Sequence, residues 1–221
     1  NVKTLEYLKN ILHNESLLIL RGSPGVGKTK LAIETIKNFV TENNSYKAYC
    51  ISYKNSDLIE DLNLYLNTNN DYILFVDDAN RIDNIGQIIG FYNQSRKGGL
   101  KIIFTVRDYA YNTIAKILTD FRYKDYTIAK FTDEQIIDIV KNEPFNILNS
   151  RYHKEIIRVA DGNPRLAIMT ALLAIEKQDL SALHNVADLF DNYFSTFIKD
   201  NGEFEKPINI KILGLAAFFH T

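Results

Sequence analysis

The sequence has few of the residues that form cross-links or metal clusters. Its single cysteine, Cys50, excludes an internal disulfide and a thiolate metal cluster. Cys50 lies in the apolar run AYCISY, where we expect a buried structural thiol. The four histidines are scattered without i,i+4 spacing or acidic companions, which argues against a histidine metal site.

The chain also lacks long apolar runs and an excess of basic charge. No apolar stretch approaches 18 residues and no signal-peptide pattern opens the sequence, so we expect a cytoplasmic protein with no membrane partner. A formal net charge of −1 disfavours nucleic acid as a partner of this segment. The sequence starts without methionine and stops in the apolar run GLAAFFHT, so we expect it to be the middle of a longer polypeptide.

What the sequence does contain is five short apolar runs that alternate with helical patterns. The runs are LLILR (17–21), YKAYCISY (46–53), YILFVDD (72–78), KIIFTVR (101–107) and YTIAKF (126–131). Runs of this length that are apolar on both faces are typical of parallel strands buried between helices. The pattern predicts an α/β fold with a parallel five-stranded sheet sandwiched by helices.

The pattern becomes wholly helical after residue 131. Thr132 and Gln135 form a predicted capping box ahead of an apolar stripe, and turns are expected at 161–165 and 201–207. We therefore expect an α/β core over residues 1–131, a helical lid over 132–200 and the start of a third unit over 201–221.

The turn after the first strand matches the phosphate-binding pattern G-x-x-x-x-G-K-[ST]. Its residues are Gly22, Ser23, Pro24, Gly25, Val26, Gly27, Lys28 and Thr29. Glycines let backbone amides approach phosphate oxygens, and the helix that follows presents free N–H groups to the anion. We expect Lys28 to contact the β- and γ-phosphates and Thr29 to ligate Mg²⁺. Lys30, in the first turn of the helix, is included in the predicted nucleotide site.

Two acidic residues end the third run. Asp77 is placed to hold Mg²⁺ through water, and Asp78 could orient or deprotonate the attacking water. Asp78 reaches one methylene less than the glutamate that many such enzymes use. A pair of acids at a strand end can also serve only as a turn or a helix cap, and for Asp78 both interpretations stay open.

The fourth run ends with Thr105 and Arg107. A polar side chain at this position can touch the γ-phosphate or the attacking water, and a nearby arginine can report the presence of the γ-phosphate. The alternative for both residues is a solvated strand end. Arg122 precedes the fifth run, where an arginine of ring-forming ATPases reaches a neighbouring subunit.

The P-loop, the paired acids, the Thr-x-Arg strand end and the helical lid together resemble the AAA+ superfamily, specifically its STAND branch, which includes the NACHT and NB-ARC groups. The segment DGNPRLAIMTALLA is similar to the Gly-x-Pro motif of STAND proteins, with Gly162 and Pro164 in the motif positions. The resemblance implies a nucleotide contact for Pro164 and a second sensor arginine at Arg165. The ending KPINIKILGLAAFF resembles the first helix of a winged-helix domain.

The resemblance implies an ATPase that works as a switch with ATP/ADP and Mg²⁺, oligomerises with its own copies when activated and hydrolyses ATP slowly. It also implies effector and sensor domains on the same longer chain. Defence or other signalling is implied by the family alone. One rival is an AAA+ motor or initiator-like ATPase that acts on DNA. Another is a nucleotide-locked scaffold that never hydrolyses ATP, in which Asp78 is only structural. No base-reading residue stands out, and the segment from Val2 to Tyr7 is the first place to look.

Overall fold

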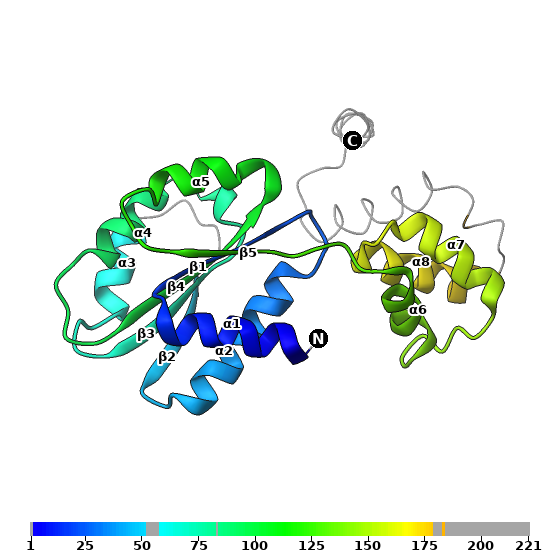
Figure 1. Cartoon of the computed structure of the whole chain (residues 1–221), viewed down its shortest axis with the longest axis horizontal. Coiled ribbons are helices and arrows are strands. Elements are labelled where there is room, and N and C mark those ends of the chain that lie inside the picture. The colour runs from blue at the N-terminus through cyan, green and yellow to red at the C-terminus, as the bar shows by residue number, and fades with distance from the viewer. Residues whose placement is uncertain (1, 52–57, 83, 179–182, 184–221) are drawn as a thin grey trace. The chain divides into compact units, whose positions relative to one another are not determined.

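The computed structural model describes residues 2–51, 58–82, 84–178 and 183 (Figure 1). The chain divides into two compact units, residues 1–129 and 130–221, and each is described by itself. The predicted start of a winged-helix domain at 201–221 lies outside the described residues. Within the described ranges, no helix combines the length and apolarity needed to cross a membrane.

The first unit alternates strands and helices along the chain (Figure 1). Its strands are β1 (Leu17–Gly22), β2 (Tyr46–Ile51), β3 (Asp71–Val76), β4 (Leu100–Arg107) and β5 (Lys124–Thr127). Its helices are α1 (Val2–Asn14), α2 (Lys28–Glu42), α3 (Leu58–Tyr65), α4 (Ile85–Tyr92) and α5 (Tyr111–Ile117). Two single-turn 3₁₀ helices, η1 (Ala79–Arg81) and η2 (Asp108–Ala110), follow β3 and β4.

The five strands form one parallel sheet in the order β2-β3-β4-β1-β5, which confirms the predicted fold class. The register sets Leu20 of β1 opposite Thr105 of β4, and Val76 of β3 opposite Phe104. The carboxyl ends of β1, β3 and β4 therefore finish side by side. Loops that leave neighbouring parallel strands at this edge usually build the ligand site.

The central strands send alternate side chains into two separate cores. In β1, Leu17 and Ile19 join the core under α3, α4 and α5, whereas Leu18 and Leu20 join the core under α1 and α2. All four side chains are fully buried, and each contributes roughly 1.5–3 kcal/mol by leaving water. Helices thus cover both faces of the sheet, as Figure 1 shows.

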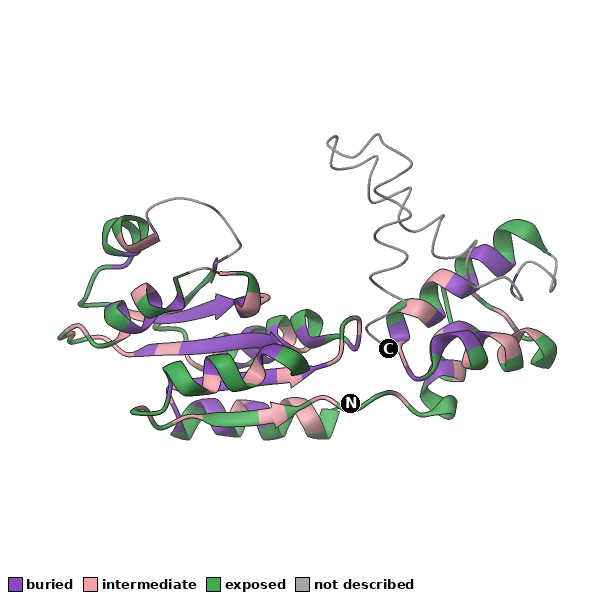
Figure 2. Ribbon diagram, turned by 90° about the horizontal axis from the view of Figure 1, so that it is seen from above, coloured by how far each residue is buried: buried purple, intermediate pink, exposed green. Residues whose placement is uncertain are grey.

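The predictions for the two outer strands are wrong in burial and partly in extent. β2 is exposed along most of its length, and Cys50 within it is exposed rather than buried. β5 is also largely exposed, as its green ribbon in Figure 2 shows, and covers Lys124–Thr127 instead of 126–131. Each outer strand has a single neighbour in the sheet, and the helices pack mainly on the central strands. The apolar residues of β2 and β5 are therefore less buried than their sequence predicted. Residues 52 and 53 of the second predicted run lie outside the described residues.

The second unit contains the helices α6 (Asp133–Lys141), α7 (Ser150–Ala160) and α8 (Pro164–Lys177). The predicted capping box at its start is confirmed: the Thr132 hydroxyl accepts from the Gln135 amide, and the Gln135 side chain accepts from the Thr132 amide. The three helices share a small core. Its buried members are Ile136, Val140, Ile156, Ala160, Ala167 and Ala171.

Candidate functional site

The P-loop leaves the end of β1 and enters α2 in a backbone path that requires glycine. Gly25 and Gly27 have φ values of 80° and 93°, a region that side chains rarely adopt. At Gly22, a Cβ atom would lie 3.0 Å from the Ile128 carbonyl oxygen and 3.1 Å from Cγ2 of Val26. The residues just after β5 therefore press against the first glycine of the loop and exclude a side chain there.

The start of α2 is built to receive an anion. Gly27 is the N-cap and supplies no side-chain acceptor, so the first-turn N–H groups and the positive end of the helix dipole are directed at the loop. Lys28 is buried, and its Nζ donates to the carbonyl oxygens of Gly22 (2.8 Å) and Ser23 (2.9 Å). Burial lowers the pKa of Lys28, although the nearby charge of Asp78 acts to raise it. A buried ammonium whose hydrogen-bond acceptors are neutral carbonyls is well suited to a phosphate.

Asp77 links the P-loop helix to two neighbouring strands. Its Oδ1 accepts from the hydroxyl of Thr29 at 2.9 Å and from the hydroxyl of Thr105 at 2.7 Å. Thr105 is fully buried, and its oxygen also accepts from the Asp78 amide at 2.8 Å. The Thr105 hydroxyl therefore fixes both acidic residues in place, which supports a positioning role. Its predicted contact with phosphate or water stays a prediction.

Asp78 is held in an unusual conformation against an arginine. Its φ of 46° is left-handed, a region that costs free energy for residues other than glycine and is common at functional sites. Its Oδ2 lies 3.5 Å from Nη2 of Arg107, and both side chains are about one-third exposed. The Arg107 amide in turn donates to Oδ1 of Asn80 at 3.3 Å. Asp78 and Arg107 thus meet at the sheet edge as a partly exposed ion pair.

Other polar side chains make contacts near the P-loop or away from it. The Ser23 hydroxyl donates to Oδ2 of Asp108 at 3.1 Å, which ties the P-loop to the end of β4. Lys30 is exposed on α2 and pairs with Glu34 at 3.0 Å. Arg122 lies away from this edge: it precedes β5 and donates through two nitrogens, at 3.1 and 2.7 Å, to Oε1 of Glu15, which precedes β1 at the opposite, amino-terminal edge of the sheet.

Asn80 and Asp108 were not predicted from the sequence, yet both contact predicted site residues. Each lies within two residues of a predicted site residue, Asp78 or Arg107. Their closeness along the chain was the available signal.

The two predicted residues of the second unit are the first two residues of α8, directly after the turn that follows α7. Asp161 and Gly162 take left-handed conformations, and the Asn163 side chain caps α8 by accepting from the Arg165 amide. Pro164 is buried at the first position of α8, where its fixed φ suits a helix start, and Arg165 is exposed. The left-handed turn and the start of α8 are enough to explain the glycine, asparagine and proline of this segment. The nucleotide contacts of Pro164 and Arg165 stay predictions.

The oxygen atoms at the sheet edge fit a magnesium ion bound together with phosphate. Thr29 and Asp77 place a hydroxyl and a carboxylate oxygen 2.9 Å apart beside the P-loop. Mg²⁺ prefers such oxygen ligands and keeps several waters and phosphate oxygens in its shell. When bound, the ion would neutralise charge on the phosphates, and Lys28 and the N-terminus of α2 would contact the same groups from the protein side.

Comparison with known proteins gives one family match. Residues 1–154 match the family model described as Novel STAND NTPase 3. A search of curated protein sequences found no match.

Solved structures share the fold. The S. cerevisiae Hsp104–ADP complex matches with a TM-score of 0.56 and 17% identity, over 98% of this chain and 37% of that one. A RuvB variant from Thermotoga maritima matches at 0.57 and 14%, over 96% of this chain and 78% of that one. A Walker-type ATPase of Pyrococcus abyssi matches at 0.58 and 14%, over 91% and 74%. The chain thus spans little more than a third of the Hsp104 chain, and identities this low establish a common fold only.

Proposed function

The chain belongs to the Novel STAND NTPase 3 family, and on that premise we propose that it is the ATP/ADP-dependent switch module of a longer signalling ATPase. The observation that carries the proposal is the network at the sheet edge. Thr29, Asp77 and Thr105 share hydrogen bonds beside the buried Lys28, and Arg107 pairs with Asp78 within the same edge. This arrangement can hold a nucleotide and detect its last phosphate.

Each group has one task in the proposed mechanism. Lys28 and the first amides of α2 bind the β- and γ-phosphates, while Thr29 and Asp77 hold Mg²⁺. Thr105 keeps both acids in position, and Asp78 orients the attacking water. Because the two acids follow directly from β3, small movements of the sheet edge are transmitted to both of them.

Arg107 distinguishes ATP from ADP in this proposal. Its ion pair with Asp78 is long and one-third exposed, so the γ-phosphate can compete for the guanidinium. A charge-assisted contact of this kind is worth roughly 1.5–3 kcal/mol. Transfer of Arg107 to the γ-phosphate would release Asp78 to act on water, and it occurs only with a triphosphate.

The free energy of two or three such contacts is enough to shift the chain between an inactive and an active state. A differential affinity of about 5.5 kcal/mol moves a two-state equilibrium from 1:99 to 99:1. We propose that ADP holds the inactive state and that ATP favours an active state that assembles with other copies, with slow hydrolysis as the reset. Residues 1–131, 132–200 and 201–221 act as core, lid and start of a winged-helix domain in this proposal. A defence role is one form of signalling that this family would allow.

The test is to denature the purified protein and identify the nucleotide that is released. One equivalent of retained ADP is expected for a locked switch. A protein that carries no nucleotide and turns over ATP freely would contradict the switch and point to an AAA+ motor, for which DNA-stimulated turnover would be measured next.

Lys28→Ala should weaken ATP binding far more than adenosine binding, because the lost contact is to phosphate. Asp78→Asn should abolish turnover, and an unchanged, easily measured rate would refute the assignment of Asp78 to the attacking water. Absence of turnover in the unaltered chain as well would indicate the nucleotide-locked scaffold.

A further inference from the structure

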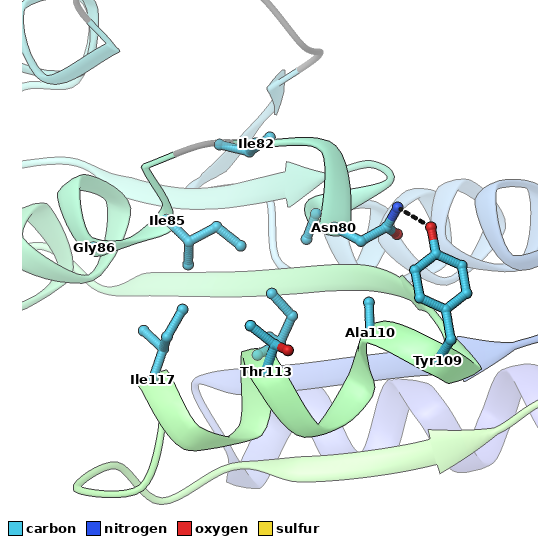
Figure 3. Close-up of a pocket in the computed structure, with 10 residues that line it drawn as sticks. Asn80, Ile82, Ile85, Gly86, Tyr109, Ala110, Thr113 and Ile117 are labelled. Carbon is cyan, nitrogen blue, oxygen red and sulfur yellow. Dashed lines mark hydrogen bonds between the residues drawn. The ribbon is translucent and has the colours of Figure 1, made fainter.

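A pocket of about 320 Å³ lies between the segments that follow β3 and β4 (Figure 3). One wall comes from η1 and α4 and includes Ile82 and Ile85. The other wall comes from η2 and α5 and includes Ala110, Ile114 and Ile117. The volume is at the lower end of the roughly 300–1,000 Å³ that small-molecule sites occupy.

The lining defines the chemistry of a matching ligand. No lining residue carries a charge, and most of the wall is aliphatic. The polar groups are the amide of Asn80 and the hydroxyls of Tyr109 and Thr113, and Asn80 and Tyr109 lie together at one end in Figure 3. A mainly apolar wall with few polar groups at one end selects a small neutral molecule that carries one hydroxyl or carbonyl.

The polar end of the pocket is connected to the nucleotide site through Asn80. Its Nδ2 donates to the Tyr109 hydroxyl at 3.4 Å, whereas its Oδ1 accepts from the Arg107 amide at 3.3 Å. Both bonds are long, and Tyr109 is 74% exposed, so a ligand can replace the tyrosine at little cost. Asn80 would then donate to the ligand through Nδ2 while its Oδ1 still accepts from the backbone amide of Arg107, at the end of β4.

We propose that this pocket binds a small neutral molecule with an apolar body and one hydroxyl or carbonyl, and that its occupancy regulates ATP binding through Asn80 and Arg107. The regulatory part rests on the proposed function, whereas the binding part does not. The two states differ in whether the Asn80 amide donates to Tyr109 or to the ligand. Because coupling between two binding sites is reciprocal, ATP must change the ligand's affinity by the same factor.

Two glycines of α4 supply a matched pair of variants. Gly86 lines the pocket, and a Cβ there meets only the Asn84 side-chain oxygen, at 3.5 Å. Gly90, one turn later, also has open space for a side chain and does not line the pocket. Both substitutions should raise helix propensity, Gly90→Leu more than Gly86→Leu, because Gly86 is only the second residue of α4. Only Gly86→Leu fills the pocket.

The experiment titrates the ¹⁵N-labelled chain with benzyl alcohol, a neutral probe, and with benzoate as its charged counterpart, without nucleotide. With benzyl alcohol we expect saturable shifts of the amides around Ile85 and Ile114. Gly90→Leu should bind the probe with unchanged affinity. In Gly86→Leu the dissociation constant should rise about tenfold or more, which corresponds to about 1.4 kcal/mol or more. Benzyl alcohol should also change the ATP dissociation constant of the wild-type chain, and Asn80→Ala should remove that change.

Equal binding by Gly86→Leu, equal binding of benzoate, or shifts confined to other regions would overturn the assignment. A change of oligomeric state in Gly86→Leu without any probe binding would instead assign the pocket to a side chain of a second copy. Probe binding without an effect on ATP affinity would overturn the regulatory part. Failure of ATP to bind any variant would refute the proposed function and leave the probe result standing.

Discussion

The substitution Thr105→Val tests whether one buried hydroxyl holds the two acidic residues in place. Valine keeps the branched shape but cannot donate to Asp77 (2.7 Å) or accept from the Asp78 amide (2.8 Å). Loss of a hydrogen bond to a charged group costs about 1.5–3 kcal/mol, and an unsatisfied buried amide costs about 1–3 kcal/mol more. The added methyl group returns about 0.8 kcal/mol. We expect the free energy of unfolding of the first unit to fall by about 2–5 kcal/mol.

The matched control is Thr35→Val in α2. Thr35 is equally buried, but its hydroxyl donates to the Leu31 carbonyl within the helix, at 2.8 Å. Only a neutral bond is lost there, so a change below about 1 kcal/mol is expected. Hydrogen exchange of peptides from β3 and α2 measures both effects in the same unit, and calorimetry measures Mg-ATP binding. Equal destabilisation by the two variants, or normal Mg-ATP binding by Thr105→Val, would refute the reasoning.

Three further predictions concern stability and pH. Among the described residues, the three buried guanidinium nitrogens of Arg96 have no hydrogen-bond partner, and the guanidinium lies 4.7 Å from the centre of the Phe91 ring. Methionine keeps an apolar contact with that ring and removes the unsatisfied nitrogens. Arg96→Met should therefore raise the free energy of unfolding by about 1–3 kcal/mol, measured as a higher urea midpoint, whereas exposed Lys97→Met should not. Because burial lowers the pKa of Lys28, its charge opposes folding. Lys28→Met should therefore stabilise the nucleotide-free chain while abolishing ATP binding, and a loss of thermal stability would contradict this. Burial, helped by a hydrogen bond with Tyr123, raises the pKa of Tyr111 from 10.0 to about 12. Protonated Tyr111 should therefore contribute its full share of the free energy of unfolding below pH 10, and this contribution should be lost as the pH rises towards 12. In Tyr111→Phe, the free energy of unfolding should fall less over that pH range.

Local residue chemistry predicted the central part of the fold. Gly22 to Thr29 could be recognised because glycines, a lysine and a hydroxyl at this spacing are the groups that a phosphate-binding loop needs. The structure shows the required positive φ at Gly25 and Gly27. The strand that carries Asp77 could be recognised because β3 lies inside the sheet, where almost every residue is buried.

The outer strands and the side-chain network could not be predicted in the same way. The position of a strand in a sheet depends on crossover connections, which local apolar content does not encode, and so the exposure of Cys50 in β2 was missed. The contact between Asn80 and Arg107 joins the ends of two strands that are far apart in sequence. Such contacts follow from strand register, which exists only after the sheet has formed.

The position of β1 between β4 and β5 has a consequence for biosynthesis. β1 is made first, yet its partners are residues 100–107 and 124–127, and Leu17 lies opposite Ile102. At about 5–20 residues per second, a ribosome needs roughly 5–20 s after β1 to deliver both neighbours. Until then the nascent chain exposes the apolar strand LLILR with both edges open, a segment that chaperones and other nascent chains can bind. The earliest segment of the nucleotide site is therefore the last to be protected, and pauses in translation before residue 128 should affect the yield of folded protein more than pauses after it.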